Sequence, residues 1–500
     1  MAALLLAVTP SVAASSNSTP AWKSYQETGN PADIVASPTV AAAIGTKVDA
    51  VNGQANGLQV QGGELTSTDV NAAVATAQGG TSAQAFAAKL HEVLSIRDFG
   101  AKCDGATDDA TAINAALSAA SSSGTPSVLV PPSVTACMVG STLIVPAGTA
   151  FYSALNAATI KATSSLSGPL AQFASAAQDM RIYGLILDGG GVDGSNTSPV
   201  VQGYQTTNAV VDSVTVQNAP RQAVLFSQSN RSGVVGSTIR NIGNHWKTTL
   251  SMSDAYAGIV VCCTAAGYGQ DNFIQNNHIS DVGLDGASVT ENARTIISGN
   301  VFDMTNQQHT LIPNASAYAA GIYAANGASI IGSANTIAGA SGSGIDTYQA
   351  KSAALYGNYV SGSGFAGILV AGDLEAVLTG NILADNVQAG SGNSNPFLGG
   401  ISLCSNIGSL IVAGNYVGNI NGTTQEYGVY AGTTANGSCT IPTASVARIG
   451  QDNDLSSNTQ GAIGPNTAFG YYQPVTGQPV PSYTLASLPT SGTEGQRAYC

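Results

Sequence analysis

The sequence predicts an all-β solenoid, a parallel β-helix built from coils of about 23 residues. Three observations lead to this fold class: a composition with 59 glycines and only 9% charged residues, an asparagine that recurs at a regular spacing, and a glycine series in step with it. About a quarter of residues are charged in typical globular domains, whereas chains rich in Gly, Ser and Asn favour stacked β-structure with tight turns. A repeat this short has no room for a covering helix, so added length adds coils and not domains.

An asparagine followed by alternating apolar residues marks each coil. The gaps between successive members are 23, 35, 23, 23, 34 and 38 residues, so three coils carry insertions. The asparagines are Asn277, Asn300, Asn335, Asn358, Asn381, Asn415 and Asn453. Asparagine tolerates left-handed backbone at a turn, and stacked amides can hydrogen-bond from coil to coil. We therefore interpret these residues as a structural ladder and not as a row of ligands.

The second series consists of the glycines in AGIVV, DGASV, AGIYA, SGIDT, AGILV, GGISL and YGVYA. The residue after each glycine and the residue two positions later should point inward, because side chains alternate along a strand. The first inward column is predicted to be Ile259, Ala287, Ile322, Ile345, Ile368, Ile401 and Val429. The second is predicted to be Val261, Val289, Ala324, Thr347, Val370, Leu403 and Ala431. The residues between the two columns should face outward.

Charge and composition exclude several classes of protein. With 28 acidic and 15 basic residues the net charge is −13, which argues against a protein that tracks nucleic-acid phosphates. No stretch reaches the roughly 18 apolar residues of a membrane helix, so no membrane insertion is predicted. No cysteine or histidine spacing indicates zinc, and we predict neither a metal site nor a cofactor. Residues 1–14 have the apolar run and small residues of a signal peptide without its cationic start, which favours a secreted protein.

The remaining chain divides into three predicted segments. Residues 15–92 form a low-complexity connector or attachment segment, in which we expect a helical stretch near 83–94. Residues 93–470 form the β-helix, beginning with a short capping helix whose first turn contains Asp108 and Asp109. Residues 471–500 form a C-terminal tail that we expect to be truncated.

The seven cysteines allow disulfides in an exported chain. Cys103–Cys137 and Cys404–Cys439 are the candidate pairs, since both close loops of similar length. An odd count leaves one thiol over, and buried unpaired cysteines are the alternative.

The stretch SIRDFGAKCDGATDDATAINAAL, followed by VLVPPSVTACMVGSTLIVPAGT and RIYGLILDGGG, resembles the first coils of the pectate-lyase-like superfamily. It is most similar to the branch shared by polygalacturonase-type enzymes and bacteriophage tailspikes. The resemblance implies a right-handed helix and a polysaccharide as the substrate class. We interpret Asp104, Asp108 and Asp109 as turn and cap residues of that motif. The Asn-Thr-Asp, Gly-Asp-Asp and Gly-His-Gly motifs of polygalacturonases are absent from the sequence, which argues against pectin hydrolysis of that type.

Candidate chemistry lies at the outward positions, which are Val260, Ser288, Tyr323, Asp346, Leu369, Ser402 and Tyr430. Only the middle coils combine a carboxylate with aromatic groups, namely Tyr323, Asp346 and, one outward position further on, Tyr348. Aromatic rings can stack on sugars, and a carboxylate can act as acid, base or nucleophile. We expect Asp373 and Glu375, beyond the next strand, to face solvent in a turn.

Further candidates lie in the turns and in an insertion. We assign catalytic roles to Asp254, Asp285, Tyr323 and Asp346, and substrate-binding roles to His245, Trp246, Glu291 and Tyr348. Asp285 and Asp346 are two coils apart, which corresponds to about 10 Å and lies just past the range of inverting glycosidases. A solvated turn residue is the alternative interpretation of each acid, and a structural role is the alternative for His278.

The sequence leaves two functions open. The first is an extracellular enzyme that cleaves a cell-surface or capsular glycan by hydrolysis or β-elimination. β-Elimination would need a base such as Tyr323 or Lys351, and Arg294 or calcium to neutralise the uronate. The second is a non-catalytic glycan-binding protein, tailspike-like or adhesin-like, associated with a virion or prophage. Residues 15–92 would then be its attachment segment, and a homotrimer is predicted.

Overall fold

The computed structural model describes residues 93–464 with short gaps, and four short strands before them. The described ranges are 60–61, 64–65, 74–76, 83–85, 93–123, 126–154, 156–191, 198–243, 257–263, 269–291, 293–305, 319–388, 397–431, 446–450 and 452–464. The chain divides into two compact units, Met1–Glu92 and Val93–Cys500. The segments 1–14 and 471–500 lie outside the described residues.

The first unit contains two antiparallel strand pairs. Strand β1 (Val60–Gln61) pairs with β2 (Glu64–Leu65), and β3 (Val74–Thr76) pairs with β4 (Ala83–Ala85). The prediction of a helical stretch near 83–94 is therefore wrong where the structure describes it, since its first residues form β4. Alanine favours helix, but this preference is small for each residue, and pairing with a partner strand can override it.

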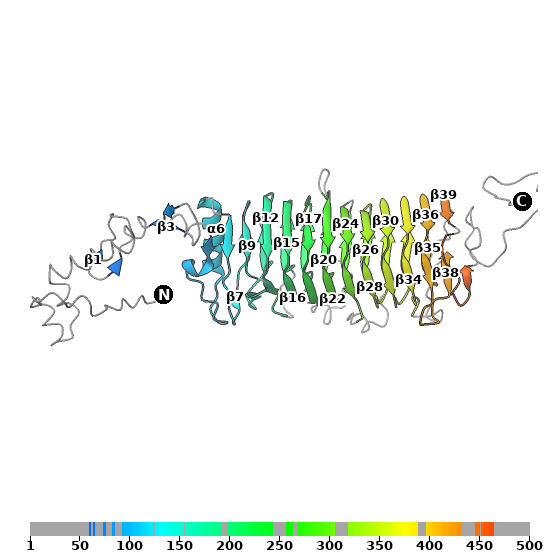
Figure 1. The fold of residues 1–500 in the computed structure, drawn as a ribbon, viewed down its shortest axis with the longest axis horizontal. Helices are drawn as coiled ribbons and strands as arrows, with labels where there is room; N and C mark the ends of the chain where they lie inside the picture. Colours follow the sequence, from blue (N-terminus) through cyan, green and yellow to red (C-terminus); the bar gives the residue numbers. More distant parts are fainter. Residues whose placement is uncertain are drawn as a thin grey trace, which may run out of the picture. The chain divides into compact units, whose positions relative to one another are not determined.

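The second unit is a right-handed parallel β-helix with three long parallel sheets (Figure 1). Sheet 1 contains β8 (Leu143–Val145), β11 (Ala171–Phe173), β14 (Val201–Tyr204), β17 (Val224–Ser227), β20 (Ile259–Cys262), β23 (Ala287–Val289), β26 (Ile322–Ala325), β29 (Ile345–Tyr348), β32 (Ile368–Ala371), β35 (Gly399–Cys404), β38 (Tyr427–Ala431) and β40 (Gly461–Ile463). Sheet 2 contains β5 (Leu94–Ser95), β6 (Ser127–Leu129), β9 (Ala150–Tyr152), β12 (Gln178–Tyr183), β15 (Thr207–Asp212), β18 (Gly233–Val235), β21 (Asn272–Gln275), β24 (Arg294–Ser298), β27 (Ser329–Ser333), β30 (Ser352–Tyr356), β33 (Glu375–Thr379), β36 (Ser409–Ala413) and β39 (Val446–Ile449). Sheet 3 contains β7 (Cys137–Val139), β10 (Thr159–Ala162), β13 (Ile186–Asp188), β16 (Thr215–Ala219), β19 (Thr238–Ile242), β22 (His278–Val282), β25 (Val301–Asp303), β28 (Thr336–Ala338), β31 (Tyr359–Ser361), β34 (Ile382–Ala384) and β37 (Tyr416–Gly418).

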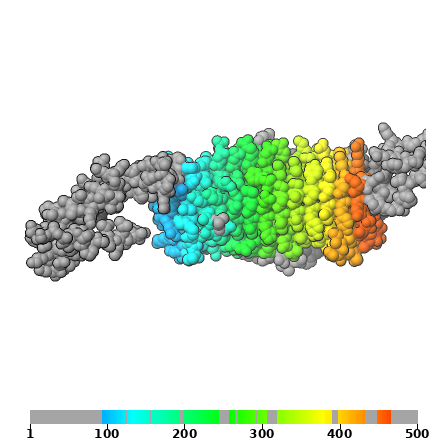
Figure 2. Space-filling view, in the orientation of Figure 1, coloured from blue at the N-terminus to red at the C-terminus, as the bar shows by residue number. Residues whose placement is uncertain are grey.

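Each coil passes through sheet 1, then sheet 2, then sheet 3, and the next coil stacks on it in register. The colours of Figure 2 accordingly follow the sequence from one end of the solenoid to the other. The two predicted inward columns are confirmed, because strand pairing in sheet 1 joins their members one coil to the next. All of these side chains are buried. Apolar columns of this kind fill the interior of the solenoid and supply its hydrophobic stabilisation.

The predicted asparagine ladder is confirmed at the corner between sheets 2 and 3. Asn358 is representative: its Oδ1 accepts the backbone N–H and the Nδ2 of Asn335, while its own Nδ2 donates to Gly332 O at 2.9 Å and to Asn381 Oδ1 at 2.9 Å. The same pattern runs from Asn277 to Asn453, and every member is buried. The ladder therefore pairs backbone groups that the turns would otherwise leave unsatisfied.

The N-terminal cap consists of a short 3-10 helix, η2 (Ile96–Phe99), and the helix α6 (Ala110–Ser123). The cap interpretation of the three aspartates agrees with their contacts. Asp108 Oδ1 accepts the N–H of Ala110 at 3.0 Å, at the start of α6. Hydrogen bonds from Thr107 and Ala106 lower the pKa of Asp104 to about 2. Asp109 is buried and accepts two backbone N–H groups.

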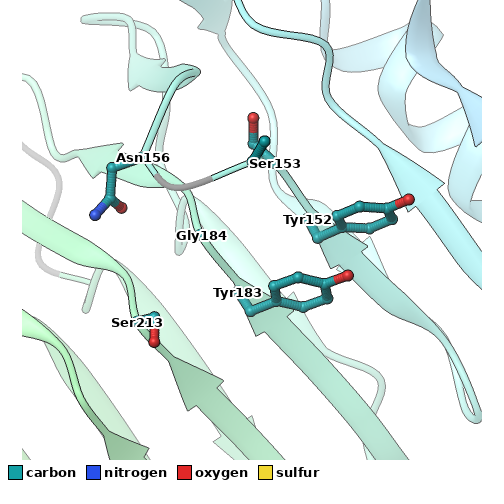
Figure 3. Close-up of a pocket in the computed structure, with 7 residues that line it drawn as sticks. Tyr152, Ser153, Asn156, Tyr183, Gly184 and Ser213 are labelled. Atoms are coloured by element: carbon teal, nitrogen blue, oxygen red, sulfur yellow. The ribbon is translucent and has the colours of Figure 1, made fainter.

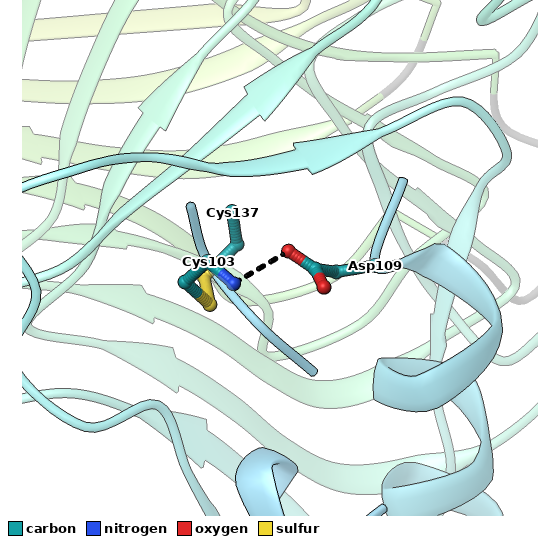
Figure 4. Close-up of side chains that lie close together, drawn as sticks. All are labelled: Cys103, Asp109 and Cys137. Carbon is teal, nitrogen blue, oxygen red and sulfur yellow. Dashed lines mark hydrogen bonds between the residues drawn. A yellow bond between two sulfur atoms is a disulfide. The ribbon is translucent and has the colours of Figure 1, made fainter. Parts of the chain in front are cut away.

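The predicted Cys103–Cys137 disulfide is present beside Asp109 (Figure 4). These three residues form a group of potential metal ligands among the described residues, but the two sulfurs are bonded to each other, so the group is a structural cross-link. Cys404 is also in a disulfide, and its predicted partner Cys439 lies outside the described residues.

A disulfide between the adjacent residues Cys262 and Cys263 was not predicted. It lies at the end of β20, where Cys262 belongs to a small apolar cluster with Ala257 and Val260. Among the described residues, no helix is long and apolar enough to cross a membrane.

Candidate functional site

The predicted outward column forms one continuous row along the outer face of sheet 1. Strand pairing joins Val260, Ser288, Tyr323, Asp346, Leu369, Ser402 and Tyr430 from coil to coil. Although they point away from the solenoid interior, Ser288 and Ser402 are completely buried and Leu369 is 6% exposed. Elsewhere on the outer face of sheet 1 the side chains are open, with Ile144 at 41% and Tyr348 at 39%. The outer face of sheet 1 is thus covered at Ser288, Leu369 and Ser402 and open beside them.

Part of the cover is visible among the described residues. Phe397 and Phe365 pack over Leu369 with their rings edge to face at 6.3 Å, together with Ala371 and Cys404. Both phenylalanines belong to chain segments that connect successive coils. An apolar cover excludes water and strengthens electrostatic interactions beneath it.

Asp346 lies between Tyr323 and Leu369 in this row, at the edge of the apolar cover. Its Oδ1 is buried and has no hydrogen-bond partner in the described part of the chain. Burial, and then the negative charge of Asp373, raise the pKa of Asp346 to about 7. A carboxyl group in this state holds its proton near neutral pH and can donate it, as a general acid must.

Asp373 corrects one prediction. It was expected to face solvent in a turn, but its side chain is completely buried. Gly372 adopts a left-handed conformation with φ of 72°, and the carboxylate of Asp373 then accepts the N–H of Ala350 in the preceding coil at 2.9 Å. Its Oδ2 has no partner among the described residues. Burial raises its pKa to about 7, against hydrogen bonds from Thr347 and Ala350.

Glu375 is exposed, as predicted, although it begins strand β33 instead of lying in a turn. The side chains of Asp346 and Asp373 come from adjacent coils, and the charge of Asp373 disfavours ionisation of Asp346. The protonation of Asp346 therefore depends on the charge of Asp373.

The aromatic candidates lie beside Asp346. Tyr323 is half-buried and directly opposite Asp346 in the strand pairing of β26 and β29. Tyr348 follows in the second outward position, is 39% exposed, and accepts a hydrogen bond from Gln349 Nε2 at 3.4 Å. A half-buried and an exposed ring next to a carboxyl group form a surface suited to a sugar residue.

Asp285 occupies a different environment. It lies in the turn that enters β23, is 4% exposed, and its Oδ1 accepts the N–H of Ala320 in the next coil at 2.8 Å. Two coils separate it from Asp346, which corresponds to about 10 Å along the solenoid axis. It also lies three residues earlier in the strand register, which adds roughly 10 Å along the strand direction. The structure therefore does not bring the two carboxyl groups together.

The other candidates are dispersed. Glu291 is exposed in the turn after β23. Asp254, His245 and Trp246 lie outside the described residues. Sheet 1 and its turns thus place Tyr323, Asp346 and Tyr348 together, with Asp373 behind them as the residue that sequence reasoning missed.

The residues considered for β-elimination are separated from one another. Arg294 lies in sheet 2 and pairs with Asp271, so its charge is already neutralised. Lys351 is exposed in the turn after β29. His278 is exposed in sheet 3, and its backbone N–H donates to Ser237 O at 2.9 Å, which agrees with the structural interpretation.

The family model described as rhamnogalacturonase A/epimerase, pectate lyase-like, matches residues 93–346, more than half of the chain. The chain belongs to this family. No curated protein sequence matches it. The resemblance stated from the first coils is thereby confirmed at the level of the family.

Solved structures show the same fold at low identity. The A-module of the Azotobacter vinelandii mannuronan C-5 epimerase AlgE4 has a TM-score of 0.57 and 17% identity, over 77% of this chain and 100% of that one. A variant tailspike protein of E. coli bacteriophage HK620, in complex with a pentasaccharide, has a TM-score of 0.55 and 14% identity, over 78% of this chain and 71% of that one. These likenesses establish the right-handed parallel β-helix.

Proposed function

We propose that this chain is a polysaccharide hydrolase that binds a glycan along the outer face of sheet 1, with Asp346 as the general acid. The observation that carries the proposal is the buried, unpartnered Oδ1 of Asp346 in an outward row beside Tyr323. Membership of a family described by a polysaccharide-cleaving enzyme supports the substrate class.

The chemistry follows from the environment of Asp346. Its carboxyl group, with a pKa of about 7, protonates the glycosidic oxygen as the bond to the sugar carbon breaks. The lost proton is regained from water after the sugar leaves. Tyr323 and Tyr348 contact the sugar rings on either side of that bond.

Hydrolysis also needs a carboxylate that activates water or attacks the sugar. Asp254 and Asp285 are our candidates for this role. The carboxyl group of Asp285 is far from that of Asp346, as described above. A catalytic role for Asp285 therefore requires the glycan to extend to the turn that enters β23. Comparing Asp254→Asn with Asp285→Asn separates the two candidates.

Hydrolysis fits the site better than β-elimination. Removing a proton next to a uronate carboxylate requires a cation to neutralise that carboxylate. Asp346 and Asp373 are carboxyl groups and cannot supply that positive charge, and Arg294 is paired with Asp271. Calcium bound with the substrate would be needed for elimination, so a calcium requirement would favour that reaction.

Location and assembly are parts of the same proposal. We propose that the protein acts outside the cell or on a virion, because disulfides persist in oxidising surroundings and the chain has two described pairs and a disulfide-bonded Cys404. The homotrimer predicted from the sequence stays part of this proposal, and light scattering would measure it.

The test is a panel of bacterial exopolysaccharides incubated with the wild-type chain and with Asp346→Asn. Reducing ends without unsaturated uronate, lost in the variant, are the expected result. Reducing ends with unsaturated uronate would indicate a lyase. Retention of a glycan without turnover in either protein would favour the second candidate, a non-catalytic glycan-binding protein.

A further inference from the structure

A second feature suited to carbohydrate lies on sheet 2, on a different face from Asp346. Tyr152 of β9 and Tyr183 of β12 occupy neighbouring coils in the same outward column. Their rings are stacked, with centroids 4.7 Å apart and planes inclined by 9°. The two hydroxyl groups point the same way, and both rings are half-buried (Figure 3). They present a continuous aromatic edge with a polar tip.

A pocket of about 350 Å³ lies beside the rings. Its lining consists of Tyr152, Ser153, Ala154, Asn156, Tyr183, Gly184 and Ser213. Pockets that hold small molecules begin at roughly 300 Å³, so this space is sufficient for one sugar ring and a part of the next.

Ser153 carries the second, independent observation. It is 1% exposed, lines the pocket, and its Oγ has no hydrogen-bond partner in the described part of the chain. A buried hydroxyl without a partner is costly and calls for an explanation. The Oγ is closed to solvent in this structure, so a ligand hydroxyl would satisfy it once the Ser153 side chain turns toward the pocket.

The electrostatics of the pocket favour an uncharged ligand. Arg181 lies over the ring of Tyr183 at 5.5 Å, but its charge is paired with Asp212. Burial, and then Tyr152, raise the pKa of Tyr183, so its phenol stays neutral. No unpaired charge is found among the described residues that line the pocket.

We propose that this pocket binds a neutral sugar residue of a polysaccharide, as a second saccharide site that takes no part in cleavage. The tyrosine rings contact the apolar faces and edges of the sugar, and Ser153 Oγ bonds one of its hydroxyl groups. The site is independent of the chemistry at Asp346, because it lies on another sheet and needs no proton transfer.

The test is affinity electrophoresis of the full chain in gels that contain dextran, galactan or mannan, with polygalacturonate as the anionic comparison. All proteins carry Asp346→Asn, so that the polysaccharide is not consumed. We expect at least one neutral polysaccharide to retard the chain, and Tyr152→Ala or Tyr183→Ala to weaken that binding at least tenfold.

Tyr356→Ala is the matched control, because Tyr356 lies in the same outward column of sheet 2, is 41% exposed, and does not line the pocket. It should change the affinity less than twofold. Ser153→Ala keeps the test interpretable if the tyrosine variants misfold. It should weaken binding without lowering the melting temperature, since it removes an unpaired buried hydroxyl.

Three results would overturn the proposal: no retardation by any of the three neutral polysaccharides, equal affinities of Tyr152→Ala and Tyr356→Ala, or unchanged affinity of Ser153→Ala. Failure of hydrolysis at sheet 1 would appear separately, as activity that survives Asp346→Asn, and would leave the binding result interpretable.

Discussion

Two buried polar regions of the same solenoid differ in their hydrogen bonding: the first is fully paired, and the second contains unpaired oxygen atoms. In the asparagine ladder, each interior amide gives and accepts hydrogen bonds from coil to coil, as Asn358 illustrates. One corner away, Asp346 and Asp373 each bury a carboxylate oxygen that has no partner among the described residues. Each ladder asparagine is paired by the asparagine of the neighbouring coil, whereas Asp346 and Asp373 have no repeated partner of this kind for these oxygens. The ladder therefore stabilises the solenoid, and the non-repeated residues Asp346 and Asp373 indicate the candidate site.

The largest expected effect tests the paired region. Asn358→Ala removes the acceptor of the Asn335 N–H and Nδ2 and the donor to Gly332 O. Leaving these buried groups unpaired should lower the free energy of unfolding by about 4 kcal/mol. Urea denaturation followed by circular dichroism measures it. An exposed asparagine outside the left-handed region, replaced in Asn421→Ala, is the control, and a loss below about 1 kcal/mol at Asn358 would contradict a stabilising ladder.

The second prediction tests the unpaired region. Asp346→Asn should lower turnover of a confirmed glycan by at least about a hundredfold, or about 2.7 kcal/mol in activation free energy, because the amide cannot donate the proton. The fold should survive, since the side chain belongs to no inward column. Glu375→Gln, an exposed acid of the next coil, should keep full activity. Full activity of Asp346→Asn would place the site on another face.

The third prediction concerns stability and pH. The pKa of Asp346 and of Asp373 is about 7 in the folded chain and near 3.8 when unfolded, so the folded state binds more protons between these values. The contribution of these two groups to the free energy of unfolding should therefore be largest below about pH 4 and should be lost as the pH rises through 7. At about 1.4 kcal/mol per pKa unit, the two units between pH 5 and the pKa give about 3 kcal/mol, and Asp373→Asn should reduce the fall between pH 5 and pH 8 by about that amount. Urea midpoints at pH 5 and pH 8, measured for the wild-type chain and for Asp373→Asn, test this. An equal fall in both proteins would contradict the raised pKa of Asp373.

The smallest effect is expected at the exposed aromatic residue. Tyr348→Ala should raise KM several-fold with little change in kcat, because a stacking contact of about 1 kcal/mol is made equally in the bound sugar and the transition state. Tyr359→Ala, on sheet 3 and 39% exposed, is the control. A fall in kcat without a change in KM would instead indicate a direct role in the chemistry.

The sequence predicts the repeated features well and the single ones poorly. The 23-residue spacing located Asn358 in its ladder and Ile345 in its column, because a stacked coil repeats the same environment at the same position. Asp346 was found by the same alternation. Asp373 was missed because its position depends on the left-handed Gly372 and on a bond to Ala350 in another coil, neither of which recurs. The cover formed by Phe397 was missed because it comes from an insertion outside the repeat.

The central claim is that the environment of Asp346 keeps its carboxyl group protonated near neutral pH. A ¹³C NMR titration of aspartate carboxyl groups, with the Asp346→Asn spectrum to assign the resonance, measures this directly. We predict a midpoint near pH 7 that moves down in Asp373→Asn, because the neighbouring charge is removed. A midpoint near the ordinary aspartate value of 3.8, unaffected by Asp373→Asn, would contradict the account.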